Sequence, residues 1–404
     1  MNGKIVIIGG GVAAVNAIKG IREHDKTSSI HLVQNESFYP YYRLRLTKSI
    51  FDKVNIDTLI LQNKEWYGDN HVTLYLGREA VSIDTKAQEV TLDNGVKLDY
   101  TSLLLANGAS NFVPTIEGIH KENVYSIRYL TDIVDIRSHA SDKNSVLCIG
   151  GGVQNLEAAW AMCSQGKKVT IAEFMDRLMP RQLDVKGSEL LKKAVEDCGA
   201  NILLGTEITK LRGDDKVSGA QTKDGQHVEC DMVIYSVGVR ANIGLYKDTP
   251  IKVNRGVIVD DHMRTSEANI YAAGDVAEFG KYSGLWTIAM GQGRIAGQNI
   301  GGSDVSFTGV VPVTNMNAFN LSVFSIGDID ENSFTHTLVE SSEEEKTYKR
   351  IFIKDNIIVG AIIIGESKDS NIIKKFIDKQ TLFKDIDFSN ISVEEFITHL
   401  RSIK

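Results

Sequence analysis

The chain has 404 residues, more than a single hydrophobic core usually serves, so two or three domains are expected. Its 42% hydrophobic and 24% charged residues are ordinary for a soluble globular protein. The net charge of −7, with both signs interspersed, argues against nucleic-acid binding, and no apolar run is long enough to span a membrane.

The chain opens on an apolar run, residues 4–8, which predicts a β-strand, and a helical pattern follows over residues 12–23. The turn between them reads Gly-x-Gly-x-x-Ala. In this pattern the glycines permit a tight turn and the close approach of a pyrophosphate, and the small third residue lets helix and strand pack. The helix N-terminus then favours the phosphates. The expected dinucleotide site comprises Gly9, Gly11, Val12, Ala13 and Ala14. A strand this early leaves no room for a cleaved leader, so the cytoplasm is the expected compartment.

The second predicted strand, residues 30–33, is followed by Gln34, Asn35 and Glu36. An acidic residue about 20 positions after the glycines commonly holds a ribose hydroxyl. Glu36 is therefore the candidate ribose ligand, with Asn35 in support. The alternative, an exposed loop carboxylate, stays open.

Strands and helical patterns alternate up to about residue 310, which predicts parallel sheets covered by helices. The opening pattern recurs: a strand over 146–149, Gly150-Gly151-Gly152, and a helical pattern over 153–165. The chain therefore contains two nucleotide-binding units of the same kind. None of its four cysteines stands in a C-x-x-C pair or at metal-ligand spacing, so reduced structural thiols and no metal site are expected.

The strand over 168–172 ends in Glu173, which can bind a ribose 2′-hydroxyl and would repel a 2′-phosphate. This favours NADH over NADPH, although Arg177 and Arg181 nearby weaken the preference. A third strand-end acid is Asp275, which follows the apolar run 270–273 and can accept hydrogen bonds from sugar or ribityl hydroxyls. The alternative role of Asp275 is that of a helix N-cap.

Beyond residue 312 the pattern changes. Strands are predicted over 321–326, 348–353 and 357–362, with an antiparallel hairpin at Lys354-Asp355-Asn356 and helical patterns after it. These elements predict a small α+β domain. The acidic run 340–345 is expected to be a solvated loop.

Taken in order, these motifs resemble the flavin-dependent pyridine nucleotide–disulfide oxidoreductase superfamily. The motifs are Gly9-x-Gly11-x-x-Ala14, Leu104-Leu105-Ala106-Asn107-Gly108, Gly150-Gly151-Gly152 with Glu157, Val237-Gly238 and Tyr271-Ala272-Ala273-Gly274-Asp275. Within the superfamily, Tyr39-Pro40-Tyr41-Tyr42-Arg43-Leu44-Arg45-Leu46 is similar to a segment of NADH:rubredoxin oxidoreductases and ferredoxin reductases. The resemblance covers residues 1 to about 310 well and the tail more loosely.

The resemblance implies a glutathione-reductase-like α/β fold with two Rossmann-like domains. FAD would bind a discontinuous domain, residues 1–110 and 238–311, and NADH would bind residues 111–237. Residues 312–404 would form the C-terminal α+β domain.

Further site residues are implied by matching positions. Arg43 and Lys48 match residues that contact FAD, and Ala80 matches a position whose backbone meets the adenine. Glu157 matches a glutamate that pairs with this lysine and so holds a positive charge near the flavin; the alternative for Lys48 is an ordinary surface lysine. The remaining matched positions are Asn107, Gly108, Gly150, Gly152 and Gly238.

Two departures from the family pattern stand out. Asn107 replaces the usual threonine before Gly108, which is tolerable. Asn155 replaces the third glycine of the NAD motif, and its larger side chain is expected to hold the helix further from its strand and to weaken NADH binding.

Residues 41–52, where related disulfide reductases and peroxidases carry cysteine, contain none. Electrons must therefore pass from the flavin directly to an external acceptor. A helix is expected to begin at residues 284–288, around Trp286 and Thr287, and to run to residue 298. Its positive end would stabilise the reduced, anionic flavin. Trp286 would lie near the flavin ring, and the alternative is a core or surface tryptophan.

The acceptor expected from this reading is a small acidic carrier such as rubredoxin, ferredoxin or flavodoxin, docked by Arg43, Arg45 and Lys281. Three alternatives remain: an NADH oxidase, a reductase component that serves nitrite, and a flavin-binding protein in which Asn155 has disabled the NADH site. A homodimer is one option for the oligomeric state.

Overall fold

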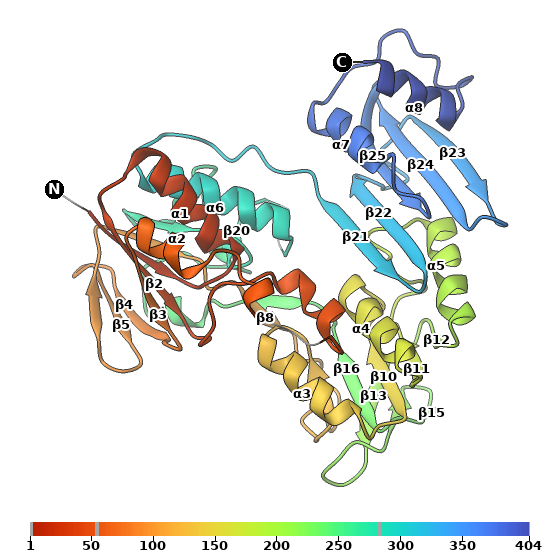
Figure 1. The fold of residues 1–404 in the computed structure, drawn as a ribbon, viewed down its shortest axis with the longest axis horizontal. Helices are drawn as coiled ribbons and strands as arrows, with labels where there is room; N and C mark the ends of the chain where they lie inside the picture. The colour runs from red at the N-terminus through yellow and green to blue at the C-terminus, as the bar shows by residue number, and fades with distance from the viewer. Residues whose placement is uncertain (1–2, 53–55, 281–283, 404) are drawn as a thin grey trace. The chain divides into compact units, whose positions relative to one another are not determined.

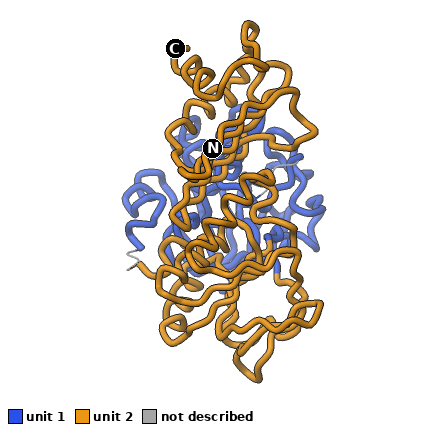
Figure 2. Tube along the Cα trace, turned by 90° about the vertical axis from the view of Figure 1, so that its right-hand side faces the viewer, with its two compact units in different colours: residues 1–45, 53–112, 238–310 blue, residues 46–52, 113–237, 311–404 orange. Residues whose placement is uncertain are grey.

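The computed structural model describes residues 3–52, 56–280 and 284–403, and the chain divides into two compact units. The first unit comprises residues 1–45, 53–112 and 238–310, and the second comprises residues 46–52, 113–237 and 311–404 (Figure 2). The second unit thus includes both the short segment 46–52 and the C-terminal region.

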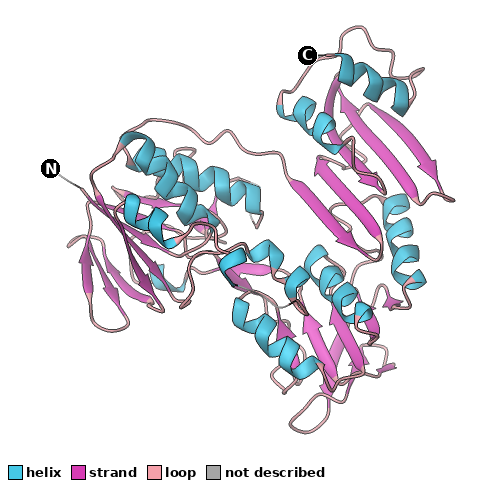
Figure 3. Cartoon of the chain, viewed as in Figure 1, coloured by secondary structure: helices cyan, strands magenta, loops and turns pink. Residues whose placement is uncertain are grey.

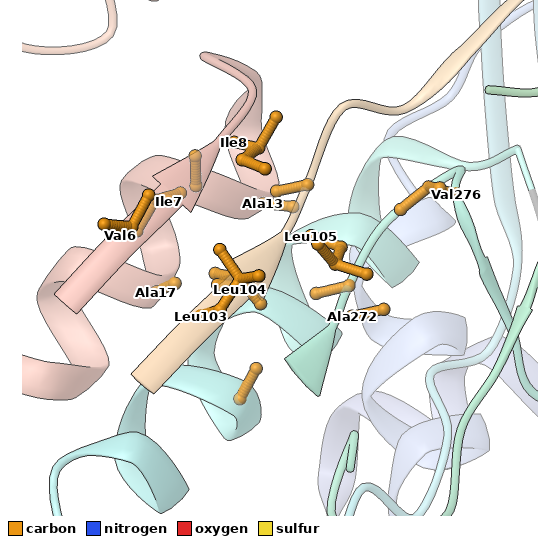
Figure 4. Packing of buried hydrophobic residues seen from close by; sticks show 14 of the residues in the cluster. Val6, Ile7, Ile8, Ala13, Ala17, Leu103, Leu104, Leu105, Ala272 and Val276 are labelled. Atoms are coloured by element: carbon orange, nitrogen blue, oxygen red, sulfur yellow. The ribbon is translucent and has the colours of Figure 1, made fainter. Parts of the chain in front are cut away.

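The first unit is built on a five-stranded parallel sheet in the order β19-β7-β1-β2-β3. Its strands are β1 (Lys4–Ile8), β2 (Ser29–Gln34), β3 (Val72–Leu76), β7 (Ser102–Leu105) and β19 (Ile270–Ala272). The central strands β1 and β7 are buried on both faces, which explains their continuous apolar sequences (Figure 4). The sheet brings the ends of β1, β2 and β19 to one edge, because parallel strands end on the same side.

Two helices of this unit, α1 (Val12–His24) and α6 (Trp286–Ile300), pack directly against each other. Small residues allow the close approach. A Cβ atom on Gly293 would come within 2.2 Å of the Ala13 carbonyl oxygen, and one on Gly297 within 2.1 Å of the Ala17 carbonyl oxygen. Ala13 and Ala17 lie on the face of α1 that is turned to the core (Figure 4). This contact joins chain segments that are far apart in sequence.

The rest of the first unit is made of short elements. Strands β4 (Ala80–Asp84), β5 (Glu89–Leu92) and β6 (Lys97–Asp99) form an antiparallel sheet. Strand β8 (Ala109–Asn111) pairs with β17 (Val239–Ala241) where the chain leaves this unit and returns to it. The remaining elements are α2 (Lys64–Asp69), β18 (Val257–Ile258), β20 (Ala277–Glu278), η1 (Arg43–Arg45), η3 (Ile56–Thr58) and η4 (Gly244–Tyr246).

The second unit repeats the plan with a parallel sheet in the order β12-β11-β10-β16-β9. Its strands are β9 (Val124–Ser126), β10 (Ser145–Ile149), β11 (Lys168–Ala172), β12 (Asn201–Leu203) and β16 (Met232–Tyr235). Its other elements are α3 (Leu130–Ala140), α4 (Val153–Ser164), α5 (Val185–Asp197), η2 (Thr47–Ser49), β13 (Ile208–Arg212), β14 (Gly219–Thr222) and β15 (His227–Val228) (Figure 3). The two parallel sheets confirm the predicted fold class.

The C-terminal region is an antiparallel sheet in the order β21-β22-β25-β24-β23, with helices α7 (Ser370–Asp378) and α8 (Val393–Ser402) (Figure 1). Its strands are β21 (Val313–Ala318), β22 (Leu321–Gly327), β23 (His336–Ser342), β24 (Thr347–Lys354) and β25 (Ile357–Ile364). The predicted hairpin between β24 and β25 is confirmed, with Asp355 and Asn356 in the left-handed region.

The expectation that residues 340–345 form a loop is wrong in part. Residues 340–342 are not loop but the end of β23, where Glu340 pairs in register with Lys349. Only Leu338 of β23 is buried, so this strand lacks the apolar alternation that would have revealed it.

Asp184 joins the C-terminal sheet to the parallel sheet region within the second unit. Its Oδ1 caps α5 by accepting from the Gly187 N–H (2.8 Å), and its Oδ2 accepts from the Tyr348 hydroxyl (2.6 Å) and Arg350 Nη1 (2.7 Å). The Asp184 side chain is almost fully buried. Removing one partner of such a buried pair is costly, so these contacts hold the two parts of the unit together. None of the helices in the described part of the chain is long and apolar enough to cross a membrane.

Candidate functional site

The turn after β1 forms an open cradle at the N-terminus of α1. Gly9 has φ of +110°, and a Cβ there would lie 2.1 Å from the Ala106 carbonyl oxygen, so this position requires glycine. A Cβ on Gly11, by contrast, would meet nothing within 4 Å, and the helix start carries no side-chain cap. The backbone N–H groups of the first turn are therefore open to an anion, which fits the pyrophosphate of a dinucleotide.

The predicted ribose ligand lies beside this cradle, after the end of β2. Glu36 accepts a hydrogen bond from the Tyr41 hydroxyl (2.6 Å) and forms an ion pair with Arg43. Its side chain is 11% exposed, whereas Asn35 is exposed. A carboxylate has about four acceptor positions, so Glu36 can still receive a ribose hydroxyl while it keeps both partners. Because Arg43 is paired with Glu36, its charge is partly neutralised by the carboxylate.

A polar network surrounds Asn107, the residue in place of the usual threonine. Its side-chain amide donates to the Asn242 carbonyl (2.9 Å), and its Oδ1 accepts from the Tyr246 hydroxyl. The Asn242 side chain in turn donates to the Asn107 carbonyl oxygen (2.8 Å). These bonds anchor the residue before Gly108, which has φ of +66°. The substitution is thus integrated into the fold, as the sequence suggested it could be.

Three more predicted residues belong to the first unit. Ala80 begins β4 and is buried, Gly238 has φ of +109° beside β17, and Asp275 follows β19 and is half-buried. The backbone N–H of Gly274, just before Asp275, donates to Gln292 Oε1 of α6 (2.9 Å). The sequence did not single out Gln292, because nothing in its local pattern distinguishes it from other polar helix residues.

Helix α6 begins at Trp286, two residues after the start of the predicted range, and it ends at Ile300. The Trp286 ring stacks on the Tyr42 ring, with centroids 5.7 Å apart. The Arg45 guanidinium lies over the same Tyr42 ring, 5.3 Å from its centroid. Thr287 Oγ1 is buried without a hydrogen-bond partner among the described residues. An orphaned hydroxyl at an uncapped helix start fits a polar ligand group there. Lys281 lies outside the described residues.

The second cradle repeats the first at the N-terminus of α4. Gly150 has φ of +108°, and a Cβ on it would lie 2.4 Å from the Ser236 carbonyl oxygen. A Cβ on Gly152 would meet nothing within 4 Å, and α4 has no side-chain cap. This geometry again fits a dinucleotide pyrophosphate.

Asn155 is 1% exposed and lies inside the second cradle. Its amide donates to the Gly150 carbonyl oxygen (2.8 Å), while its Oδ1 has no partner among the described residues. The side chain that was expected to hold the helix away from its strand thus also binds the glycine turn. This contact was not foreseen because it depends on the rotamer of a buried amide rather than on spacing.

Glu173 closes the second cradle from the end of β11. One carboxylate oxygen accepts from the Gly151 N–H and the other from the Met175 N–H (2.7 Å), and the residue is 9% exposed. These bonds fix the carboxylate next to the glycine turn, where a nucleotide ribose would lie. The negative charge at this point disfavours a 2′-phosphate.

Lys48 and Glu157 are brought together within the second unit. Lys48 Nζ lies 3.4 Å from Glu157 Oε1, and the Thr47 hydroxyl donates to Glu157 Oε2 (2.5 Å). Burial raises the pKa of Glu157, and the Thr47 hydroxyl and the Lys48 ammonium act in the opposite direction. The sequence did not identify Thr47, although a hydroxyl residue directly before the candidate lysine was the available signal.

The cysteines have the character of structural thiols. Burial raises the pKa of Cys163 to about 11 and that of Cys230 to about 12, and it raises the pKa of the fully buried Cys148 as well. Thiols with such pKa values are protonated and poorly nucleophilic at neutral pH.

The chain belongs to the pyridine nucleotide-disulphide oxidoreductase family, whose model matches residues 3–293. The model of the rubredoxin NAD+ reductase C-terminal domain matches residues 312–381. The chain is 33% identical over 384 residues to an NADH-rubredoxin oxidoreductase of Clostridium acetobutylicum, which covers 95% of this chain and 96% of that protein. The crystal structure of NADH:rubredoxin oxidoreductase from the same organism superposes with a TM-score of 0.77 at 30% identity, covering 99% of this chain and 100% of that chain.

A second relative is larger. A nitrite reductase [NAD(P)H] of Bacillus subtilis (strain 168) is 32% identical over 380 residues, which cover 93% of this chain but only 47% of that protein. This chain therefore spans about half of that enzyme.

Proposed function

We propose that the protein is an FAD-dependent NADH oxidoreductase that passes electrons to a small redox protein, with rubredoxin as the first candidate. The observation that carries this proposal is the pair of open glycine cradles, one at α1 in the first unit and one at α4 in the second. A protein with a single nucleotide would need only one of them. The match of the C-terminal region to a rubredoxin NAD+ reductase domain supports the choice of carrier.

The first unit would hold the FAD. The helix start at Val12 and Ala13 would bind its pyrophosphate, Glu36 a ribose hydroxyl, and Asp275 the hydroxyls of the ribityl chain. FAD, when bound, accepts a hydride from NADH and can release electrons singly to a carrier. The uncapped N-terminus of α6 at Trp286 and Thr287 would place a positive partial charge where negative charge accumulates.

The second unit would hold the NADH, with the pyrophosphate at the N-terminus of α4 and the adenine-side ribose at Glu173. Here the protein acts by positioning and electrostatics, and no residue is assigned as an acid, base or nucleophile. Lys48, paired with Glu157, would contribute a positive charge to the reaction.

Glu173→Ala is expected to weaken NADH binding and to bring NADH and NADPH closer in affinity, with a change in their ratio of about tenfold or more. The variant removes both the ribose acceptor and the charge that repels a 2′-phosphate. Binding constants for both nucleotides measured on the yellow protein would check this. Glu173→Gln is the comparison variant: it removes the charge and keeps one acceptor oxygen, while its NH2 group replaces the oxygen that accepts from one of the two backbone N–H groups. An unchanged NADH to NADPH ratio in both variants would remove Glu173 from the site.

A surface available for a carrier is the patch made of the exposed Tyr42, Leu44 and Arg45 together with the half-buried Trp286. Tyr42 is 39% and Leu44 59% exposed, and Arg45 adds a positive charge. Apolar area with a basic residue beside it suits an acidic partner. In this patch Arg45, rather than the Glu36-paired Arg43, supplies the steering charge.

The proposed function predicts that NADH-dependent reduction of rubredoxin is faster than oxygen consumption and falls as salt is raised. Arg45→Glu should lower the rate of carrier reduction at low salt by about tenfold and remove most of the salt dependence, without changing NADH binding. Rubredoxin, ferredoxin and flavodoxin would be compared in the same assay. Oxygen consumption faster than reduction of every carrier would instead identify an NADH oxidase.

A further inference from the structure

The short segment 46–52 belongs to the second unit, although residues on both sides of it in sequence belong to the first (Figure 2). Its apolar side chains Leu46 and Ile50 are buried, and Lys48 stands between them with 48% of its side chain exposed. The segment is a 3-10 turn, in which the Ser49 N–H donates to the Leu46 carbonyl oxygen (3.0 Å). A turn this short cannot fix its own position, so contacts from other elements must do so.

Arg137 of α3 makes two such contacts. Its Nε donates to the Ile50 carbonyl oxygen (2.6 Å) and its Nη2 to the Ser49 carbonyl oxygen (2.8 Å). These carbonyls immediately follow Lys48 and lie at the end of the turn, where carbonyls lack partners within the helix. The rigid fork of a guanidinium is suited to binding two adjacent acceptors at once.

Glu157 of α4 also contacts the segment, through the Thr47 hydroxyl and the Lys48 ammonium. The ion pair alone is a weak restraint, because an ammonium on a long, half-exposed side chain loses entropy when it is fixed and is screened by salt. The two hydrogen bonds from Arg137 act on the backbone, and like the Thr47 hydroxyl bond to the Glu157 carboxylate they involve a charged group, which makes them the stronger kind.

We propose that Arg137 is a positioning residue that fastens the 46–52 segment to the NADH-binding unit and thereby places the Lys48 ammonium. This inference rests on the proposed role of Lys48 in the reaction of NADH with FAD. Arg137 itself touches only the backbone of Ser49 and Ile50 in these bonds, so it acts through the segment and not on a ligand.

The test uses the full-length, FAD-loaded protein and two readouts. Hydrogen exchange of the 46–52 backbone amides reports the attachment of the segment, and stopped-flow measurement of flavin reduction by NADH reports its consequence. Arg137→Gln should speed the exchange of these amides about tenfold or more. It should slow flavin reduction at saturating NADH by about tenfold while the affinity for NADH stays the same. Arg212→Gln, the same change at an exposed arginine of the same unit, should alter neither readout.

A double variant shows whether Arg137 acts through Lys48. If it does, Arg137→Gln with Lys48→Ala should reduce flavin no more slowly than Lys48→Ala alone, because coupled residues are not additive. Arg137→Lys keeps the charge and offers a single ammonium to the two carbonyls. Its amide exchange and its rate of flavin reduction should lie between those of the wild type and Arg137→Gln, and it serves as the test variant if Arg137→Gln does not fold.

Each contrary result has a distinct meaning. Unchanged exchange of the 46–52 amides overturns the fastening role, whatever Lys48 does. A second contrary result is faster exchange in Arg137→Gln, together with a wild-type rate of flavin reduction in both Arg137→Gln and Lys48→Ala. It would show that Lys48 has no role in the reaction, and it would overturn the proposal for that reason. If the losses in flavin-reduction rate from Arg137→Gln and Lys48→Ala add up in the double variant, Arg137 does not act through Lys48. This result would also overturn the proposal.

Discussion

A Gly11→Val variant is expected to fold normally and to be purified without FAD. Gly11 has φ of −87° and ψ of −174°, an extended conformation that any residue adopts, and a Cβ there would meet no atom of the chain within 4 Å. The valine side chain would instead fill the space in which a pyrophosphate approaches α1. We expect FAD affinity to fall by about two orders of magnitude or more, or ~3 kcal/mol.

The measurements for this variant are the flavin content of the purified protein, its circular dichroism and its FAD affinity on reconstitution. A valine at an N-cap costs the helix about 1 kcal/mol relative to glycine, which a protein of this size tolerates. Gly68→Val is the control, since Gly68 also has open space around its Cβ position but lies on the surface of α2. A yellow Gly11→Val protein with wild-type affinity would place the FAD elsewhere.

Gly152→Val is expected to give the complementary result: a yellow protein that NADH no longer reduces. Gly152 has φ of −85° and ψ of 169°, and a Cβ there also meets nothing within 4 Å. The side chain would block the second cradle while the first remains intact. The affinity for NADH should fall at least about a hundredfold, again ~3 kcal/mol.

The two valine variants serve as controls for each other, because each blocks one cradle and leaves the other unchanged. NADH titration of the Gly152→Val protein, with flavin absorbance as the readout, measures the loss directly. Loss of flavin from this variant, or normal reduction by NADH, would contradict the assignment of one nucleotide to each unit.

Local sequence pattern was sufficient to predict the two cradles. The glycine spacing, the apolar strand before it and the helical pattern after it are all contiguous, so Gly9 and Gly150 could be identified as turn residues and the helix starts at Val12 and Val153 are confirmed. Parallel sheets followed from the alternation of strands and helices, which leaves few other arrangements.

Individual side-chain contacts could not be predicted in this way, whether the two residues lie close together or far apart in the sequence. The pairing of Glu36 with Arg43 depends on the path of the loop between them, and the bonds from Arg137 to the segment 46–52 connect positions almost ninety residues apart. The hydrogen bond of Asn155 to Gly150 depends on one buried rotamer. Spacing identifies which residues stand near a ligand, whereas only packing decides what else they touch.

Strand β23 shows a second limit. Its sequence is mostly polar, with Glu340 as its acidic residue, because it pairs with β24 at the edge of the sheet and only Leu338 is buried. Edge strands carry charged residues that prevent pairing with other molecules. The same residues made the segment resemble a loop.

Anaerobic titration of the purified protein with NADH tests the central claim most directly. The proposed function predicts a yellow protein whose colour is bleached by NADH and restored when oxidised rubredoxin is added. A protein that contains no flavin and cannot be reconstituted with FAD, or one whose colour NADH leaves unchanged, would contradict it.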